Sequence, residues 1–216
     1  LVPAPLRRFT MTKDILITGD SYSCDWTVKY TNQGLGWPNL LAQDYTVTNV
    51  AMAGSSIVRT LWQLQSENIN DYDAVIVTHT SPNRIYVAEH PIHKDDLLHK
   101  NADLIHTDIK HQSQTKPELQ CIVDYFEKYY DLDYSRFVYN LIEEKIDGLF
   151  NNYTGKVIHM TNLLRDNCYQ FTDMLDCSDL IGKRYHGLIN HYNNKANTIV
   201  YNRVKSLLEE NVSCSK

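Results

Sequence analysis

One serine in this sequence stands where a nucleophile could attack a substrate. Ser21 follows the apolar run Asp14–Thr18, at the turn Gly19-Asp20-Ser21, where glycine lets the chain bend and the hydroxyl can project from a sheet edge. A serine hydroxyl is a weak nucleophile until a neighbouring imidazole accepts its proton. Alone, the tripeptide is more often a turn in which the aspartate caps the next segment. Its place after a strand favours acyl-transfer chemistry.

The candidate for the accepting imidazole lies far along the chain. His191 stands in Asn190-His191-Tyr192-Asn193, directly before the last helical stretch. A lone histidine at a helix start more often makes a local cap. His186 competes for the role, but the residues after it lack the polar turn and the helix that follow His191. On these residues alone, His191 is the better placed of two candidates for the base.

The elements that must position these residues alternate between strand and helix. The apolar runs that predict strands are Asp14–Thr18 and residues 45–50, 73–78 and 155–160. The apolar spacing that predicts helices occurs in residues 37–42, 56–66, 117–150 and 193–210. This alternation predicts an α/β fold with a mainly parallel sheet between two layers of helices. In such folds ligands collect beyond the carboxyl ends of the strands, where Ser21, Gly54 and Asn83 all stand.

Four short blocks, taken in order, make the chain similar to the SGNH hydrolases, also called the GDSL esterase family. The resemblance covers nearly all of residues 14–208. Within it, Ser21 in residues 15–23 matches the family's nucleophile, and His191 in residues 190–197 matches its general base. The resemblance implies a three-layer α/β/α sandwich and ester hydrolysis through an acyl-enzyme.

The resemblance also implies an oxyanion hole, which would hold the negative charge of the tetrahedral intermediate. Its donors would be the backbone N–H groups of Ser21 and Gly54 and the side-chain amide of Asn83. Removing one such donor typically costs about 10²–10³ in rate. The third block of the resemblance is residues 81–84, which contain Asn83. It departs from the family's G-x-N-D pattern, because Ser81 replaces the glycine and Arg84 replaces the aspartate.

A second departure concerns the acid that usually orients the histidine. The family has an aspartate three residues before it, and this chain has Leu188, which cannot accept a hydrogen bond from the imidazole. A backbone carbonyl, an ordered water or another carboxylate must then orient His191. Asp176 and Asp179 are the nearest upstream carboxylates, but neither has the expected spacing. We expect a carbonyl or a water.

Family resemblance makes small acyl esters the expected substrates, including acetyl groups on carbohydrates. Two alternatives stay open. One is a non-catalytic binding or structural module that keeps the fold, and the other is an acyltransferase in which a hydroxyl intercepts the acyl-enzyme in place of water. The G-x-S-x-G elbow of the α/β-hydrolases is absent from the sequence.

Composition places the chain among globular proteins. Its 216 residues fit one domain, which we assign to residues 11–216, while residues 1–10 resemble an expression remnant or a mobile arm. The net charge of −5 and the scattered Lys and Arg argue against nucleic-acid binding. No apolar run approaches the roughly 20 residues of a membrane span, and no leader opens the chain. With five widely spaced cysteines, these features predict a cytoplasmic location.

One segment, residues 89–116, stands apart as a polar, histidine-rich insertion without clear periodicity. Its length suggests a lid, a binding arm or a mobile segment at the mouth of the site. Its five histidines match no tight metal pattern such as H-E-x-x-H. We therefore expect solvated loop histidines, no bound metal and no cofactor.

Overall fold

Five strands form one parallel sheet in the order β2-β1-β3-β6-β7. The computed structural model describes residues 13–30, 34–162, 168–171, 173–180 and 189–210. The strands of the sheet are β1 (Asp14–Thr18), β2 (Thr46–Asn49), β3 (Ala74–His79), β6 (Lys156–Thr161) and β7 (Met174–Asp176). A separate antiparallel pair consists of β4 (Arg84–Ile85) and β5 (Leu104–Ile105). Residues 1–10, where an arm was predicted, lie outside the described residues.

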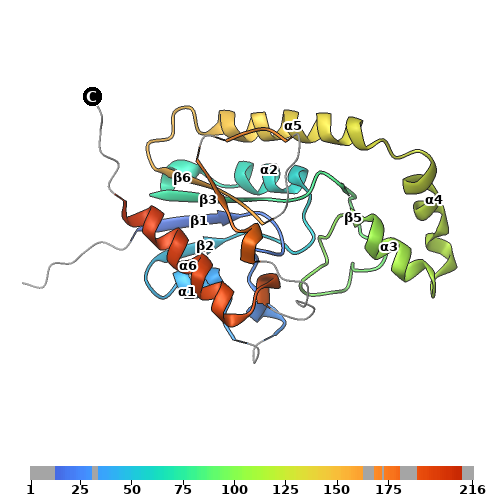
Figure 1. Cartoon of the computed structure of the whole chain (residues 1–216), viewed down its shortest axis with the longest axis horizontal. Helices are drawn as coiled ribbons and strands as arrows, with labels where there is room; N and C mark the ends of the chain where they lie inside the picture. The colour runs from blue at the N-terminus through green and yellow to red at the C-terminus, as the bar shows by residue number, and fades with distance from the viewer. Residues whose placement is uncertain (1–12, 31–33, 163–167, 172, 181–188, 211–216) are drawn as a thin grey trace, which may run out of the picture.

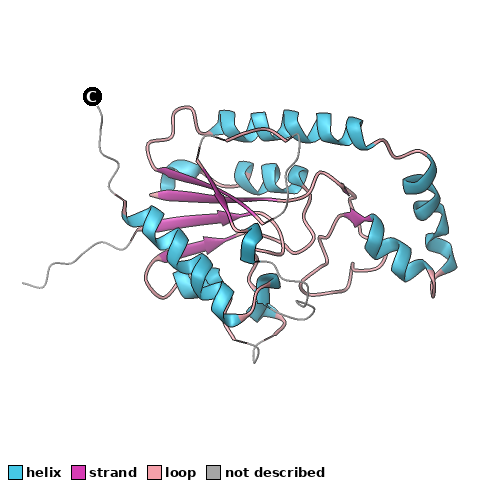
Figure 2. Cartoon of the chain, viewed as in Figure 1, coloured by secondary structure: helices cyan, strands magenta, loops and turns pink. Residues whose placement is uncertain are grey.

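Helices cover both faces of the sheet, as Figures 1 and 2 show. The helices are α1 (Trp37–Leu41), α2 (Ile57–Gln65), α3 (His106–Ser113), α4 (Gln120–Lys128), α5 (Leu132–Leu149) and α6 (Asn194–Glu209). Helices α2 and α5 lie on one face, and α1 and α6 lie on the other. The predicted three-layer α/β/α class with a parallel sheet is confirmed.

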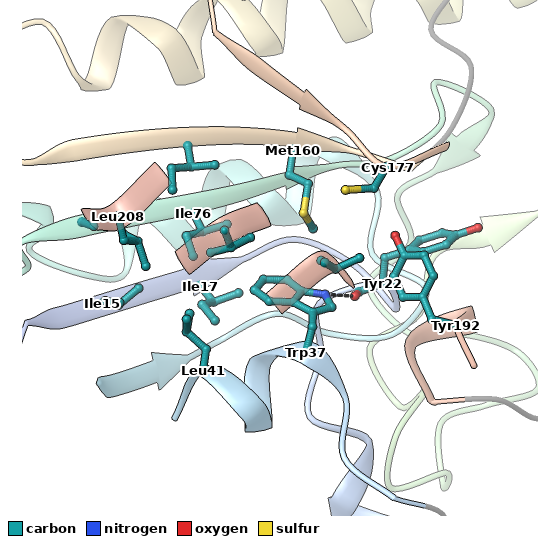
Figure 3. Close-up of a cluster of buried hydrophobic side chains, with 14 of the residues drawn as sticks. Ile15, Ile17, Tyr22, Trp37, Leu41, Ile76, Met160, Cys177, Tyr192 and Leu208 are labelled. Carbon is teal, nitrogen blue, oxygen red and sulfur yellow. Dashed lines mark hydrogen bonds between the residues drawn. The ribbon is translucent and has the colours of Figure 1, made fainter. Parts of the chain in front are cut away.

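The two cores follow from the alternation of side chains along each strand. In β1, Ile15 and Ile17 face the layer of α1 and α6, whereas Leu16 faces α2 and α5. Figure 3 shows the first core, in which the Trp37 side chain lies beside Ile17 and Leu41. The Trp37 indole N–H donates to the Tyr22 carbonyl at 2.7 Å, so this core reaches the loop that carries Ser21. The sheet and this loop are thereby packed as one unit.

Three elements differ from the sequence prediction. Strand β7 was not predicted, because only three residues form it and none is buried. The predicted helix over residues 117–150 is two helices, since Asp131 caps α5 by accepting the N–H groups of Asp133 and Tyr134 at 2.9 Å. The insertion contains a helix, α3, which was missed because Ile109 is its one buried residue.

Helices α3 and α4 lie beyond the end of the sheet to which the strand arrows point (Figure 1). The segment from β4 to α4 therefore stands over the carboxyl ends of the strands, where parallel sheets collect their ligands. None of the helices in the described ranges combines the length and the apolar character that crossing a bilayer requires.

Candidate active site

A tightly fixed turn presents Ser21 at the end of β1. Gly19 has a φ of +131°, and a Cβ at that position would lie 2.6 Å from the Cβ of Thr78 on the neighbouring strand, so only glycine fits. The carboxylate of buried Asp20 accepts the N–H of Tyr22 at 3.0 Å. The carbonyl of Ser21 accepts the indole N–H of Trp26 at 2.8 Å. The backbone that carries the serine is held from three sides.

The imidazole of His191 lies against the Ser21 hydroxyl, with 2.8 Å between Nε2 and Oγ. Asn190 and His191 both have left-handed backbones, with φ of 51° and 60°, a conformation that costs energy for residues other than glycine. The Asn190 amide offsets this cost by donating to the carbonyls of Ser21 at 3.2 Å and Cys24 at 2.8 Å. The segment before α6 is thereby tied to the serine loop.

Two backbone N–H groups point to a place for an oxyanion. Within the described part of the chain, neither the N–H of Ser21 nor that of Gly54 has a hydrogen-bond acceptor. Gly54 has a φ of +79°, and a Cβ there would lie 2.6 Å from the Cβ of Ala102, so the loop after β2 approaches the insertion closely. Ser21, Gly54 and His191 line the same cavity of ≈ 330 Å³. The role of the two N–H groups as oxyanion donors stays a prediction.

Asn83 is not brought into this group. Its side chain is exposed and lines a neighbouring cavity of ≈ 360 Å³, on the far side of Ile105, which borders both cavities. The next residue, Arg84, lines the pocket of Ser21 instead. Ser21 and Asn83 thus line different cavities in the structure, and the role of Asn83 as an oxyanion donor stays a prediction.

Arg84, a departure from the family pattern, joins two of the loops. One guanidinium nitrogen lies 3.0 Å from the carboxylate of Asp20, and another donates to the carbonyl of Ser55 at 2.7 Å. Asp20 is fully buried and the Arg84 side chain is 9% exposed, so this ion pair is largely shielded from water. Arg84 thus connects the loop of Ser21 to the loop of Gly54. In the sequence, a role for Arg84 was indicated by the replacement of the family's aspartate with an arginine.

The Cys24 thiol and the Tyr22 hydroxyl, on the same loop as Ser21, stay protonated. Cys24 is buried, and burial together with the charge of Asp20 raises the pKa of its thiol far above the usual range, so it does not supply a thiolate nucleophile. Burial and Asp20 likewise raise the pKa of Tyr22 to about 12. The Tyr22 ring packs on His191, with 4.6 Å between ring centroids. Tyr22 lines the pocket, and neither side chain competes for the serine proton.

The two carboxylates considered for His191 have other partners. Asp176 accepts the N–H of Ser178 at 2.8 Å. Asp179 forms a two-pronged ion pair with Arg203, each contact 2.9 Å, and this hydrogen bonding lowers the pKa of its carboxyl group. Leu188 and the competing base His186 lie outside the described residues.

The insertion forms the second wall of the pocket, through His93, His99, Asp103 and Asp108. Asp103 is buried and holds this wall to the rest of the fold, since its carboxylate accepts from the N–H of Ser56 at 2.8 Å and from Arg59 at 2.9 Å. The bordering position predicted for the insertion agrees with this placement. The sequence did not place these four residues at the pocket, because contacts such as those of Asp103 with Ser56 and Arg59 form only in the folded chain.

The expectation of solvated histidines is wrong for one of the five. His90 is 1% exposed, and burial, followed by the proximity of His93, lowers its pKa to about 4. His93 contacts Asp108, with 3.0 Å between Nε2 and the carboxylate oxygen, and this hydrogen bond lowers the pKa of Asp108. This wall therefore contains the ionised carboxylate of Asp108 and the neutral, buried imidazole of His90.

Comparisons with known proteins find no matching family model and no matching curated protein. Several solved structures are similar to the chain, two of which are described here. One is a proposed lipolytic protein of the G-D-S-L family from Desulfitobacterium hafniense DCB-2, with 10% identity, a TM-score of 0.46, and 91% of this chain and 99% of that chain covered. The other is an extracellular lipase from Streptomyces rimosus, with 14% identity, a TM-score of 0.35, and 90% and 72% covered. At these values the likenesses carry no argument about activity, which has to come from the site itself.

Proposed function

We propose that this protein is a serine-dependent esterase that cleaves small acyl esters through an acyl-enzyme on Ser21. One observation carries the proposal, namely the 2.8 Å contact between His191 Nε2 and Ser21 Oγ at the wall of a cavity. A general base must lie within hydrogen-bond reach of the proton it removes, and this distance satisfies that requirement.

The first half-reaction forms the acyl-enzyme. His191 takes the hydroxyl proton of Ser21 as Oγ bonds to the ester carbonyl carbon. The negative oxygen of the tetrahedral intermediate then accepts hydrogen bonds from the N–H groups of Ser21 and Gly54, which have no other acceptor among the described residues. As the intermediate collapses, the imidazolium returns the proton to the leaving alcohol. The acyl group stays on Ser21.

The second half-reaction repeats these roles with water. His191 removes a proton from a water molecule, whose oxygen attacks the acyl carbon, and the second tetrahedral intermediate uses the same two N–H donors. Its collapse releases the carboxylic acid and restores the serine hydroxyl. A cavity of ≈ 330 Å³ is at the small end of ligand pockets, which supports small acyl esters, with acetylated carbohydrates among the candidates.

The test is covalent labelling followed by turnover. A fluorophosphonate should modify Ser21, which is located by peptide mass spectrometry, and p-nitrophenyl esters should be cleaved faster when the acyl chain is short. Ser23→Ala is the matched control, because the Ser23 hydroxyl lies on the same loop but contacts the carbonyls of Thr18 and Asp20. This control should keep both labelling and turnover.

Each alternative gives a different result. A non-catalytic module would leave Ser21 unlabelled in the wild-type protein. An acyltransferase would be labelled, but with an alcohol acceptor present its main product would be a new ester rather than the free acid.

A further inference from the structure

The insertion brings a second histidine and carboxylate pair into the pocket of Ser21. His93 lies in the turns after β4, and Asp108 lies in the first turn of α3. The distance from His93 Nε2 to the Asp108 oxygen is 3.0 Å. An ionised carboxylate only accepts hydrogen bonds, so Nε2 of His93 carries a proton and donates it. In the neutral ring, the lone pair then lies on Nδ1.

This Nδ1 atom is available to a ligand. Within the described residues, no protein group is hydrogen-bonded to Nδ1 of His93, whose side chain is 24% exposed and lines the cavity together with Ser21. The donated bond to Asp108 fixes the tautomer and orients the ring, and it makes the opposite nitrogen a better acceptor. The pocket therefore offers a fixed hydrogen-bond acceptor on the wall that the insertion supplies.

A metal ion is the competing occupant of this region. One potential ligand atom from each of His90, His93 and Asp108 lies within 4.8 Å of the other two. However, Nδ1 of His90 accepts the backbone N–H groups of Ile92 and His93, both at 3.2 Å. Backbone N–H groups only donate, so the proton of neutral His90 sits on Nε2. A histidine that binds a metal through Nε2 ordinarily carries its proton on Nδ1 and donates it to a neighbour. In His90 this is prevented, because Nδ1 faces two backbone N–H donors.

We propose that His93 is a hydroxyl-recognition residue, whose Nδ1 accepts a hydrogen bond from a hydroxyl group on the alcohol half of the ester. The substrate class is then esters of polyhydroxylated alcohols, and the proposal rests on the esterase function of Ser21. A site built to bind a hydroxyl discriminates against an analogue without it, because the site's polar group is left unpaired. The anchored Asp103 keeps this wall in position for such a contact.

The test compares two acetyl esters that differ in the alcohol. Glycerol monoacetate carries free hydroxyl groups and ethyl acetate carries none, while p-nitrophenyl acetate reports the catalytic machinery. We expect His93→Ala to lower kcat/KM for glycerol monoacetate about tenfold, mainly through KM, and to change the other two less than about twofold. His93→Gln should recover part of the loss, because its amide oxygen also accepts. His111→Ala, an exposed residue of α3, is the control.

Three results would overturn this proposal while leaving the esterase in place. The first is that His93→Ala loses activity equally on all three esters, and the second is that it loses none on glycerol monoacetate. The third is that a chelator stops the cleavage of glycerol monoacetate and that calorimetry detects Zn²⁺ binding, which His90→Ala abolishes. If the wild-type protein instead fails to cleave p-nitrophenyl acetate and takes no fluorophosphonate label, the proposed function itself has failed.

Discussion

The two walls of the pocket are built in different ways. Ser21 and Gly54 stand on loops that follow strands of the central sheet, and each loop has a backbone that only glycine allows. The opposite wall, from His93 to Asp108, rests on the short strand β5 and on α3, and side-chain carboxylates hold it in place. In our proposal the first wall does the chemistry and the second selects the substrate. Changes in the first should act on kcat, and changes in the second should act on KM.

The largest effect is expected from the first wall. Ser21→Ala removes the nucleophile, so kcat for p-nitrophenyl acetate should fall by at least about 10³-fold. The hydroxyl contributes little packing, so circular dichroism and the thermal unfolding midpoint should stay near those of the wild-type protein. Turnover that survives in Ser21→Ala would assign the chemistry to another residue.

His191→Ala should cost about 10³-fold or more in kcat, because no other imidazole among the described residues contacts the Ser21 hydroxyl. Asp176→Asn and Asp179→Asn should each cost less than about tenfold, since these carboxylates bind Ser178 and Arg203. All three variants are measured with p-nitrophenyl acetate. A large loss in either asparagine variant, with the fold intact, would mean that the carboxylate orients the base.

Arg84 joins the loops of Ser21 and Gly54, which both belong to the first wall, and its removal tests how far these two loops depend on each other. Arg84→Met leaves the buried carboxylate of Asp20 without its ion pair, which should cost about 3–5 kcal/mol in the free energy of unfolding. Urea unfolding measures this quantity. The double variant Asp20→Asn with Arg84→Met should regain part of it, because the uncompensated charge is gone. Equal stability of the wild-type protein and Arg84→Met would show that water already solvates this pair.

The smallest effect is expected at Asn83. The family resemblance predicts a loss in kcat of about 10²-fold or more for Asn83→Ala, through a missing oxyanion donor. In the structure this side chain is exposed and lines the neighbouring cavity, so we expect less than about threefold. Steady-state kinetics separates the two. A drop of 10² in kcat at constant KM would mean that Asn83 turns into the pocket when substrate binds.

Sequence patterns predicted the helices and strands whose own residues determine their structure. Strand β3 was visible as a short, mostly apolar run that is buried throughout, and helix α6 was visible because its buried side chains follow a helical period. Strand β7 and α3 were not, since each gains its place from neighbours and buries almost nothing of its own. The blocks around Ser21 and His191 predicted the contact that the structure contains. The role of Arg84 was not predicted, because the sequence does not show that Asp20 is its partner.

The contact between Ser21 and His191 joins residues 170 positions apart, and this span has a consequence for the order of folding. Helix α6 follows His191 directly, and its Asn197 side chain accepts the N–H of Trp37 at 2.9 Å. A contact between residues so far apart in sequence forms only after the sheet has brought β1 and the segment before α6 together, so it forms late. A chain that has assembled its sheet but not docked α6 has a serine without a base. During refolding, esterase activity should therefore return together with the change in Trp37 fluorescence. Partly folded molecules should not cleave esters.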